Sequence, residues 1–200
     1  MRALVLGLSL AVLVTACGNG DGTPRVRVAV DAAPAITAPV EVEQPKIALS
    51  APVEAKIDDI RAILERNSLT RLVRLANAEE NFVSNFAGES HRVHWDLLRR
   101  TGFDPLLRLD ALLDGPYGTR QVGDQTWFIW PNFAALEPED LLPEKLNFTD
   151  RARLRDLVGE TGLERIRAGE RYPGIRTAIA EDGRWLYFVH ETVQETEASE

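Results

Sequence analysis

His91 and His94 are the residues whose types and spacing could support chemistry in this chain. Positions i and i+3 share one face of a helix, so both imidazoles could bind one metal ion. Asp96 or Glu89 would supply a carboxylate ligand, and either histidine could act as a general base. The His-Glu-x-x-His pattern of zinc proteases is absent, and His190 is the only other histidine. A helix start that simply carries polar side chains is the alternative interpretation.

Aromatic residues concentrate in two predicted strands and in the loops beside them. Tyr117, Trp127 and Trp130 could line a groove that binds a glycan or a peptide, because aromatic faces pack well on apolar ligand surfaces. Aromatic side chains in strands also fill small protein cores, so a structural role is the alternative. Other residues that would join the groove or its rim are Asn85, Gly88, Phe133, Trp185 and Tyr187.

Signatures that define a reaction are absent from the chain. Ser84 and Ser90 lie outside any Gly-x-Ser-x-Gly elbow, and the glycine-rich segment 18–22 precedes no helix that could bind phosphate. We therefore expect no cofactor. The first hypothesis is a domain that binds a ligand or partner without catalysis. The second is an enzyme or metal-dependent hydrolase that uses His91 and His94.

The only cysteine of the chain, Cys17, ends the motif Val14-Thr15-Ala16-Cys17. Arg2 and the apolar segment Ala3–Leu13 precede this motif, and the segment is too short to span a bilayer as a helix. An aliphatic residue and two small residues before a cysteine resemble the lipobox of bacterial lipoprotein precursors. The resemblance implies that residues 1–16 are a signal peptide. It also implies that Cys17 becomes the N-terminus and carries diacylglycerol and an acyl chain such as palmitate.

A lipidated Cys17 would place the protein in the cell envelope. One acyl chain binds a membrane only marginally, whereas two or three hold a protein stably. In Gram-negative lipoproteins an aspartate after the cysteine favours the inner membrane, and here Gly18 follows. In such a host the resemblance implies an outer-membrane lipoprotein that faces the periplasm. Lipidation of the one cysteine leaves the folded region without a thiol for catalysis, disulfides or metal binding.

The acidic balance of the chain limits its partners. Its 31 acidic and 23 basic residues give a net charge of −8, and the sequence shows no basic cluster. Nucleic acids need lysine and arginine to neutralise their phosphates, so we expect no nucleic-acid partner. Electrostatic docking on anionic lipid is disfavoured for the same reason, and lipid on Cys17 would make the membrane contact. The partners that remain are an envelope protein, a glycan or a small ligand.

Composition divides the mature chain into three segments. Residues 17–52 are rich in proline, alanine and valine and predict an extended spacer behind the lipidated Cys17. Residues 53–190 have the apolar content of one globular domain. Residues 191–200 form an acidic tail. The domain would therefore work at a distance from the membrane.

Periodic apolar residues predict helices through most of the domain. These helices span about 57–64, 69–76, 90–100, 105–113, 138–142, 149–158 and 163–168. Side chains that accept hydrogen bonds from free N–H groups can cap helices, and the candidates are Ser68, Ser90, Asp104 and Thr149. In the third helix Val93 and Leu97 are expected to face the core, with Trp95 or Leu98. The segment before this helix is expected to be irregular and anchored by Phe82 and Phe86.

Two hairpins are expected among the helices. Strands at 119–122 and 126–130 flank one turn, and strands at 175–180 and 184–190 flank Glu181-Asp182-Gly183, whose Asp-Gly pair is a strong turn signal. Every residue of Trp127–Trp130 is bulky and apolar, so both faces of this strand carry large side chains, which indicates a strand covered on both faces. The order of elements predicts an α+β fold with an antiparallel sheet of about four strands. An NTF2-like cone is one candidate by analogy.

The region from about 81 to 191 is similar to uncharacterised domains of bacterial lipoproteins. The similarity rests on the strand end Ile129-Trp130-Pro131 and on the final hairpin, Asp182–Val189. It implies no activity. The sequence therefore predicts a membrane-tethered cell-envelope protein and leaves the identity of its ligand open.

Overall fold

The computed structural model describes residues 47–191. The lipobox with Cys17, most of the predicted spacer and the acidic tail after Glu191 lie outside the described residues. Within the described part, no helix has both the length and the apolar character that crossing a membrane requires.

Four helices precede the sheet: α1 (Ala51–Leu64), α2 (Leu69–Ala78), α3 (His91–Arg100) and α4 (Pro105–Leu113). Three of the predicted caps are confirmed. The Ser68 hydroxyl accepts from the Arg71 N–H, the Ser90 hydroxyl caps α3, and the Asp104 carboxylate caps α4. These contacts satisfy N–H groups that have no partner inside the helix, so each helix begins where the sequence predicts.

The sheet is antiparallel, and its strands lie in chain order. Its members are β1 (Gly118–Val122), β2 (Gln125–Trp130), β3 (Arg176–Ala180) and β4 (Trp185–Val189). The two predicted hairpins are therefore neighbours, joined side by side through β2 and β3. Three helical segments connect them: η1 (Asn132–Ala135), α5 (Pro138–Leu141) and α6 (Phe148–Arg167). The predicted α+β class with four antiparallel strands is confirmed, while the NTF2-like arrangement stays a prediction.

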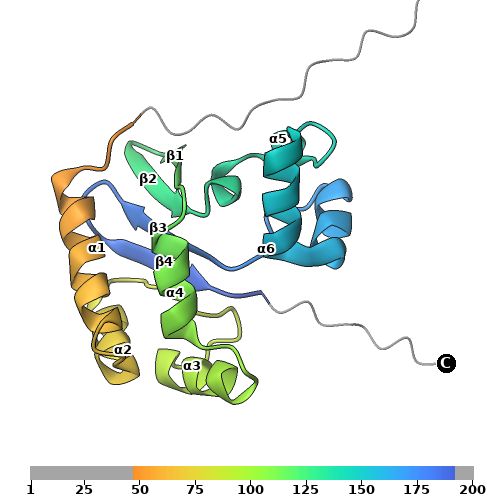
Figure 1. The fold of residues 1–200 in the computed structure, drawn as a ribbon. Helices are drawn as coiled ribbons and strands as arrows, with labels where there is room; N and C mark the ends of the chain where they lie inside the picture. Colours follow the sequence, from red (N-terminus) through yellow and green to blue (C-terminus); the bar gives the residue numbers. More distant parts are fainter. Residues whose placement is uncertain (1–46, 192–200) are drawn as a thin grey trace, which may run out of the picture. The chain divides into compact units, whose positions relative to one another are not determined.

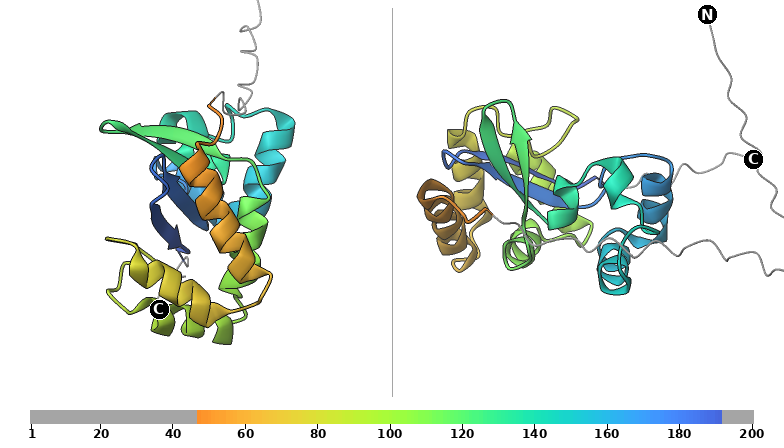
Figure 2. Two further views of the ribbon diagram at one scale, coloured as in Figure 1. Left: turned by 90° about the vertical axis from the view of Figure 1, so that its left-hand side faces the viewer. Right: turned by 90° about the horizontal axis from the view of Figure 1, so that it is seen from above.

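Each face of the sheet carries its own hydrophobic core. Helices α1–α4 pack against Phe128, Trp130 and Trp185 on one face. On the other face η1, α5 and α6 pack against Ile129 and Ala178. Figures 1 and 2 show the sheet between α1–α2 on one side and α5–α6 on the other. Adjacent residues of β2 point to opposite faces, so its continuous bulky run is covered on both sides, as predicted.

A register shift in β4 changes which side chains share a face. Ala178 pairs with Tyr187 and Ile179 pairs with Trp185, so Leu186 is the extra residue of a β-bulge. Strict alternation would place Trp185 and Phe188 on opposite faces. The bulge instead brings both into the core under α1–α4, where their rings stack 6.5 Å apart.

The orientation of α3 differs from the sequence-based prediction. Val93 and Leu97 are 56% and 48% exposed, whereas Trp95 and Leu98 are buried. The Trp95 ring stacks on Trp185 with centroids 6.5 Å apart. Burial of this large indole removes more apolar surface from water than burial of a valine would, so the helix turns its tryptophan inward.

Helix α6 begins at Phe148, with its cap two residues earlier than predicted, and it is interrupted. Asn147, rather than Thr149, is its cap, and the Asn147 side chain accepts from the Asp150 N–H. Gly159 has φ +66°, which only glycine adopts readily, so the helical path breaks there into the two helices that the sequence predicts.

Residues 47–52 pack on the domain rather than extending from it as spacer. Leu49 contacts the core, the Ser50 hydroxyl donates to the Glu181 carbonyl at 2.7 Å, and the Tyr117 hydroxyl donates to the Ile47 carbonyl at 3.2 Å. Pro52 already lies inside α1, because proline suits the first turn of a helix. The folded domain thus starts several residues before position 53.

Candidate functional site

A short irregular segment before α3 positions the predicted histidine pair. Val83 forms a parallel bridge with Tyr187, so this segment extends the sheet beyond β4. Phe82 is buried as predicted, but Phe86 is 73% exposed and anchors nothing. The Asn85 carboxamide oxygen accepts from the backbone N–H groups of Ala87 and Glu89. One side chain therefore holds the turn that leads into α3.

His91 is held in place by buried neighbours. Its Nδ1 lies 2.7 Å from the hydroxyl of Ser84, which is 2% exposed. Its ring meets the Phe82 ring edge-on, with centroids 5.2 Å apart. Burial, and secondarily the neighbouring His94, lowers the pKa of His91. The neutral ring is therefore favoured, and its contacts give it a structural role at the start of α3.

His94 faces a different environment one turn along α3. Its Nε2 is buried and has no hydrogen-bond partner among residues 47–191. Its Nδ1 lies 3.8 Å from the Glu89 carboxylate, beyond hydrogen-bond distance. Burial lowers the pKa of His94, and Glu89 partly opposes that shift. His94 thus presents a neutral imidazole whose buried Nε2 has no partner in the described part of the chain.

Of the two proposed carboxylate ligands, Asp96 is engaged elsewhere. Asp96 pairs with Arg92 at 2.6 Å, one turn before it on α3. Arg92 in turn donates to the Thr70 hydroxyl of α2, so this ion pair joins two helices. In the part of the chain that the structure describes, no three histidine, cysteine, aspartate or glutamate side chains are grouped so that they could hold a metal ion.

The predicted aromatic residues do not meet in one groove. Trp130 is 1% exposed and lies in the core under α1–α4. Tyr117 covers it, with ring centroids 5.4 Å apart. Trp127 lies on the opposite face of the sheet, where it packs edge-on against Tyr187. Trp185 and Phe133 are fully buried. Most of these rings therefore fill the two cores.

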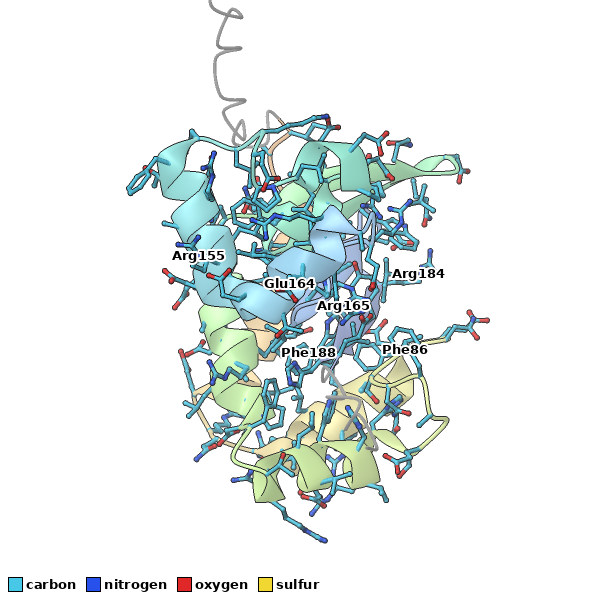
Figure 3. All side chains as sticks on the ribbon, turned by 90° about the vertical axis from the view of Figure 1, so that its right-hand side faces the viewer. Phe86, Arg155, Glu164, Arg165, Arg184 and Phe188 are labelled. Carbon is cyan, nitrogen blue, oxygen red and sulfur yellow. The ribbon has the colours of Figure 1, made fainter. Side chains whose placement is uncertain are left out.

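Two adjoining cavities form the candidate site instead, and both include His190 and Glu191. The larger, of about 460 Å³, lies between α4, α6 and the end of β4 and is lined by Phe103, Arg108, Val158 and Ile175 among others. The smaller, of about 290 Å³, is lined by Asn85, Phe86, His94 and Arg165. Figure 3 shows Arg165 on α6 and Phe86 before α3 on this same side of the domain.

His190 forms the wall between the two cavities. It stacks on Phe103 with centroids 4.1 Å apart and an angle of 13° between the rings. Its Nδ1 is buried and lacks a hydrogen-bond partner in the described chain. Burial lowers the pKa of His190, and the nearby Arg108 and His94 lower it further. A neutral imidazole keeps one donor and one acceptor nitrogen.

Charged groups around this wall fall into two kinds. Glu191 is held by Arg176 and Arg165, which fixes its carboxylate. Arg108 lies over the Phe103 ring at 5.7 Å and makes no ion pair with a described residue. Its guanidinium at the rim of the larger cavity is therefore available to an anion.

Sequence reasoning singled out His94 but missed its partner. His94 and His190 are separated by most of the domain in the chain, and the packing of α3 against the end of β4 brings them to one cavity. The one signal that could have found His190 is its position at the end of a strand, beside Glu191. The tertiary structure is needed to identify this pair.

Comparisons of the chain with protein-family models, curated proteins and solved structures give no match. The geometry of the two cavities is therefore the basis for assigning a function.

Proposed function

We propose that this protein is a lipid-anchored protein of the cell envelope whose folded domain binds a small carboxylic acid in the two cavities that meet at His190. The observation that carries the ligand proposal is the pair of buried imidazole nitrogens, His94 Nε2 and His190 Nδ1, which have no partner among the described residues. A buried polar atom without a hydrogen bond costs about 1–3 kcal/mol, and a ligand that bonds it recovers part of this cost.

The surroundings favour an acid with an apolar body. Cavities of several hundred Å³ with apolar walls and a few polar groups are typical of small-molecule sites. Phe103, Val158 and Ile175 supply the apolar wall. Arg108 supplies a guanidinium that pairs with no carboxylate among residues 47–191, and a guanidinium recognises a carboxylate through two parallel hydrogen bonds. The domain would thus bind and hold its ligand without changing it.

The contacts of His91 and Asp96 do not support the alternative function, an envelope hydrolase with His91 and His94 as metal ligands. Ser84 occupies His91 Nδ1, and Asp96 is paired with Arg92.

Titration calorimetry with a panel of aliphatic and aromatic carboxylates tests the ligand proposal. His190→Phe keeps a ring on Phe103 but deletes the nitrogen, and Arg108→Gln deletes the charge. Each should weaken binding about tenfold or more, since hydrogen bonds to charged groups contribute about 1.5–3 kcal/mol. Arg155→Gln, whose side chain pairs with Glu160 outside both cavities, is the matched control. If His190→Phe and Arg108→Gln bound the carboxylate as tightly as the parent chain and the Arg155→Gln control, this site would be refuted.

The anchor is tested separately. Cys17→Ala should abolish labelling with radioactive palmitate and move the protein from the membrane fraction to the soluble fraction. Ser84→Ala, which leaves Cys17 intact, should label like the parent chain. Labelled protein in the Cys17→Ala strain would rule out Cys17 as the lipidated residue and leave the ligand proposal standing.

A further inference from the structure

A second concave surface, independent of the two cavities, lies between α1 and α2. This α1–α2 groove has a volume of about 470 Å³. Its floor is apolar and consists of Ala62, Ile63, Leu75 and Ala78. On α2 the lining positions 71, 74, 75 and 78 follow the i, i+3, i+4, i+7 pattern of a single helix face, and positions 59, 62 and 63 follow the first part of that pattern on α1. The two small alanines leave the floor open, so a third apolar element could lie along both helices.

Three arginines line the α1–α2 groove, and none is neutralised by the domain. Arg66 lies two residues after the end of α1, and Arg71 and Arg74 lie on α2. Among residues 47–191, none of these three side chains makes an ion pair or a hydrogen bond. Neighbouring arginines behave differently: Arg61 pairs with Asp114.

This concentration of free positive charge is unusual in a chain of net charge −8. Acidic residues flank these arginines in the sequence, with Asp58 and Asp59 in α1 and Glu79 just after α2, although α2 itself contains none. The fold brings the three arginines to one rim and leaves Asp59 as the only acidic residue that lines the groove. The potential there should favour an acidic partner.

The shape of the groove decides which acidic partner fits. A bilayer surface is flat and cannot reach the apolar floor between two helices. An amphipathic helix can, because it places apolar side chains on such a floor and charged ones at its rim. We propose that the α1–α2 groove binds an acidic amphipathic helix of a partner protein, with apolar residues on Ile63 and Leu75 and carboxylates on Arg66, Arg71 and Arg74.

Fluorescence anisotropy with the detergent-purified full-length chain tests this proposal. The probe is a labelled peptide of about 15 residues, long enough to form a helix, with leucine and alanine on one face and glutamates flanking that face. Affinity should fall about tenfold in the triple variant Arg66→Glu/Arg71→Glu/Arg74→Glu, since each exposed pair contributes several tenths of a kcal/mol. Ala62→Phe, which fills the floor without changing charge, should also weaken binding.

The matched control is Arg99→Glu/Arg100→Glu, which reverses two exposed arginines of α3 outside the groove. This variant should bind the acidic peptide like the parent chain, and circular dichroism should show that all variants are folded. Binding should weaken as salt is added, because salt screens exposed charges.

Three outcomes would overturn the proposal. The first is equal binding of a peptide in which lysines replace the glutamates. The second is binding of phosphatidylglycerol vesicles, but not of the peptide, in an Arg66-, Arg71- and Arg74-dependent way, which would assign the surface to lipid. The third is binding only of a peptide with the sequence of residues 192–200, which would assign the groove to the chain's own tail.

Discussion

At the scale of single residues, a buried chain of hydrogen bonds links two neighbouring strands. The Trp185 indole N–H donates to the Thr177 hydroxyl at 2.8 Å. That hydroxyl donates in turn to the Tyr187 carbonyl at 2.7 Å. Thr177 and Trp185 are both fully buried. A buried indole usually has a hydrogen-bond partner, because an unpaired N–H inside a core is costly.

Thr177→Val should destabilise the domain by about 1–3 kcal/mol, because the valine fills the same space but leaves the Trp185 N–H unsatisfied. Thr177→Ser keeps the hydroxyl and should cost clearly less. Urea unfolding followed by tryptophan fluorescence gives both free energies. If the valine variant were as stable as the serine variant, the hydrogen bond would contribute nothing to folding.

At the scale of elements, the rotation of α3 about its axis determines which of its side chains reach the sheet. Trp95 and Leu98 pack inward, and Val93 and Leu97 face outward. The same rotation aims His94 toward β4 and leaves the ion pair of Arg92 and Asp96 on the surface side. The binding site proposed at His190 therefore depends on the packing of one aromatic residue of α3.

Two adjacent leucines test this rotation. Leu98→Ala should lower the free energy of unfolding by about 2–5 kcal/mol, since it opens a cavity beneath α3. Leu97→Ala, one position earlier, should change it by no more than about 0.5 kcal/mol, because that side chain is half exposed. Chemical denaturation of the two variants compares them directly. The reverse order of effects would mean that α3 buries its other face.

At the scale of the whole molecule, the three histidines link stability to pH. Burial lowers the pKa of His91, His94 and His190 below the ordinary value of 6.5. Below pH 6.5 the unfolded chain therefore binds protons that the folded chain does not. Stability is fully present above that value and is lost as the pH falls toward the lowered values.

The free energy of unfolding should thus decrease from about pH 7 to about pH 5.5, before most carboxylates begin to bind protons. Urea titrations at several pH values measure the slope. His94→Gln should reduce the slope, because it removes one of the three groups that the folded state keeps neutral. A flat profile for the parent chain over this range would contradict the burial of the histidines.

Local signals in the sequence determined most elements of the fold. Ser68 and Asp104 predict helix starts because a cap acts within three residues. Asp182-Gly183 predicts the last hairpin because a tight turn requires the φ of +88° that Gly183 adopts. The bulky run of β2 predicts a strand covered on both faces. These interactions join residues that are close in sequence, so the residue types alone predict them.

Only the tertiary structure decided where the candidate sites lie. The bulge at Leu186 places Trp185 beside Phe188, and the packing of α3 on β4 brings His94 to the cavity of His190. The pairing of α1 with α2 sets Arg71 and Arg74 of α2 beside Ile63 of α1 around one groove. These contacts join residues from different elements. Their energies come from shape and burial in three dimensions, and no local pattern of residue types encodes them.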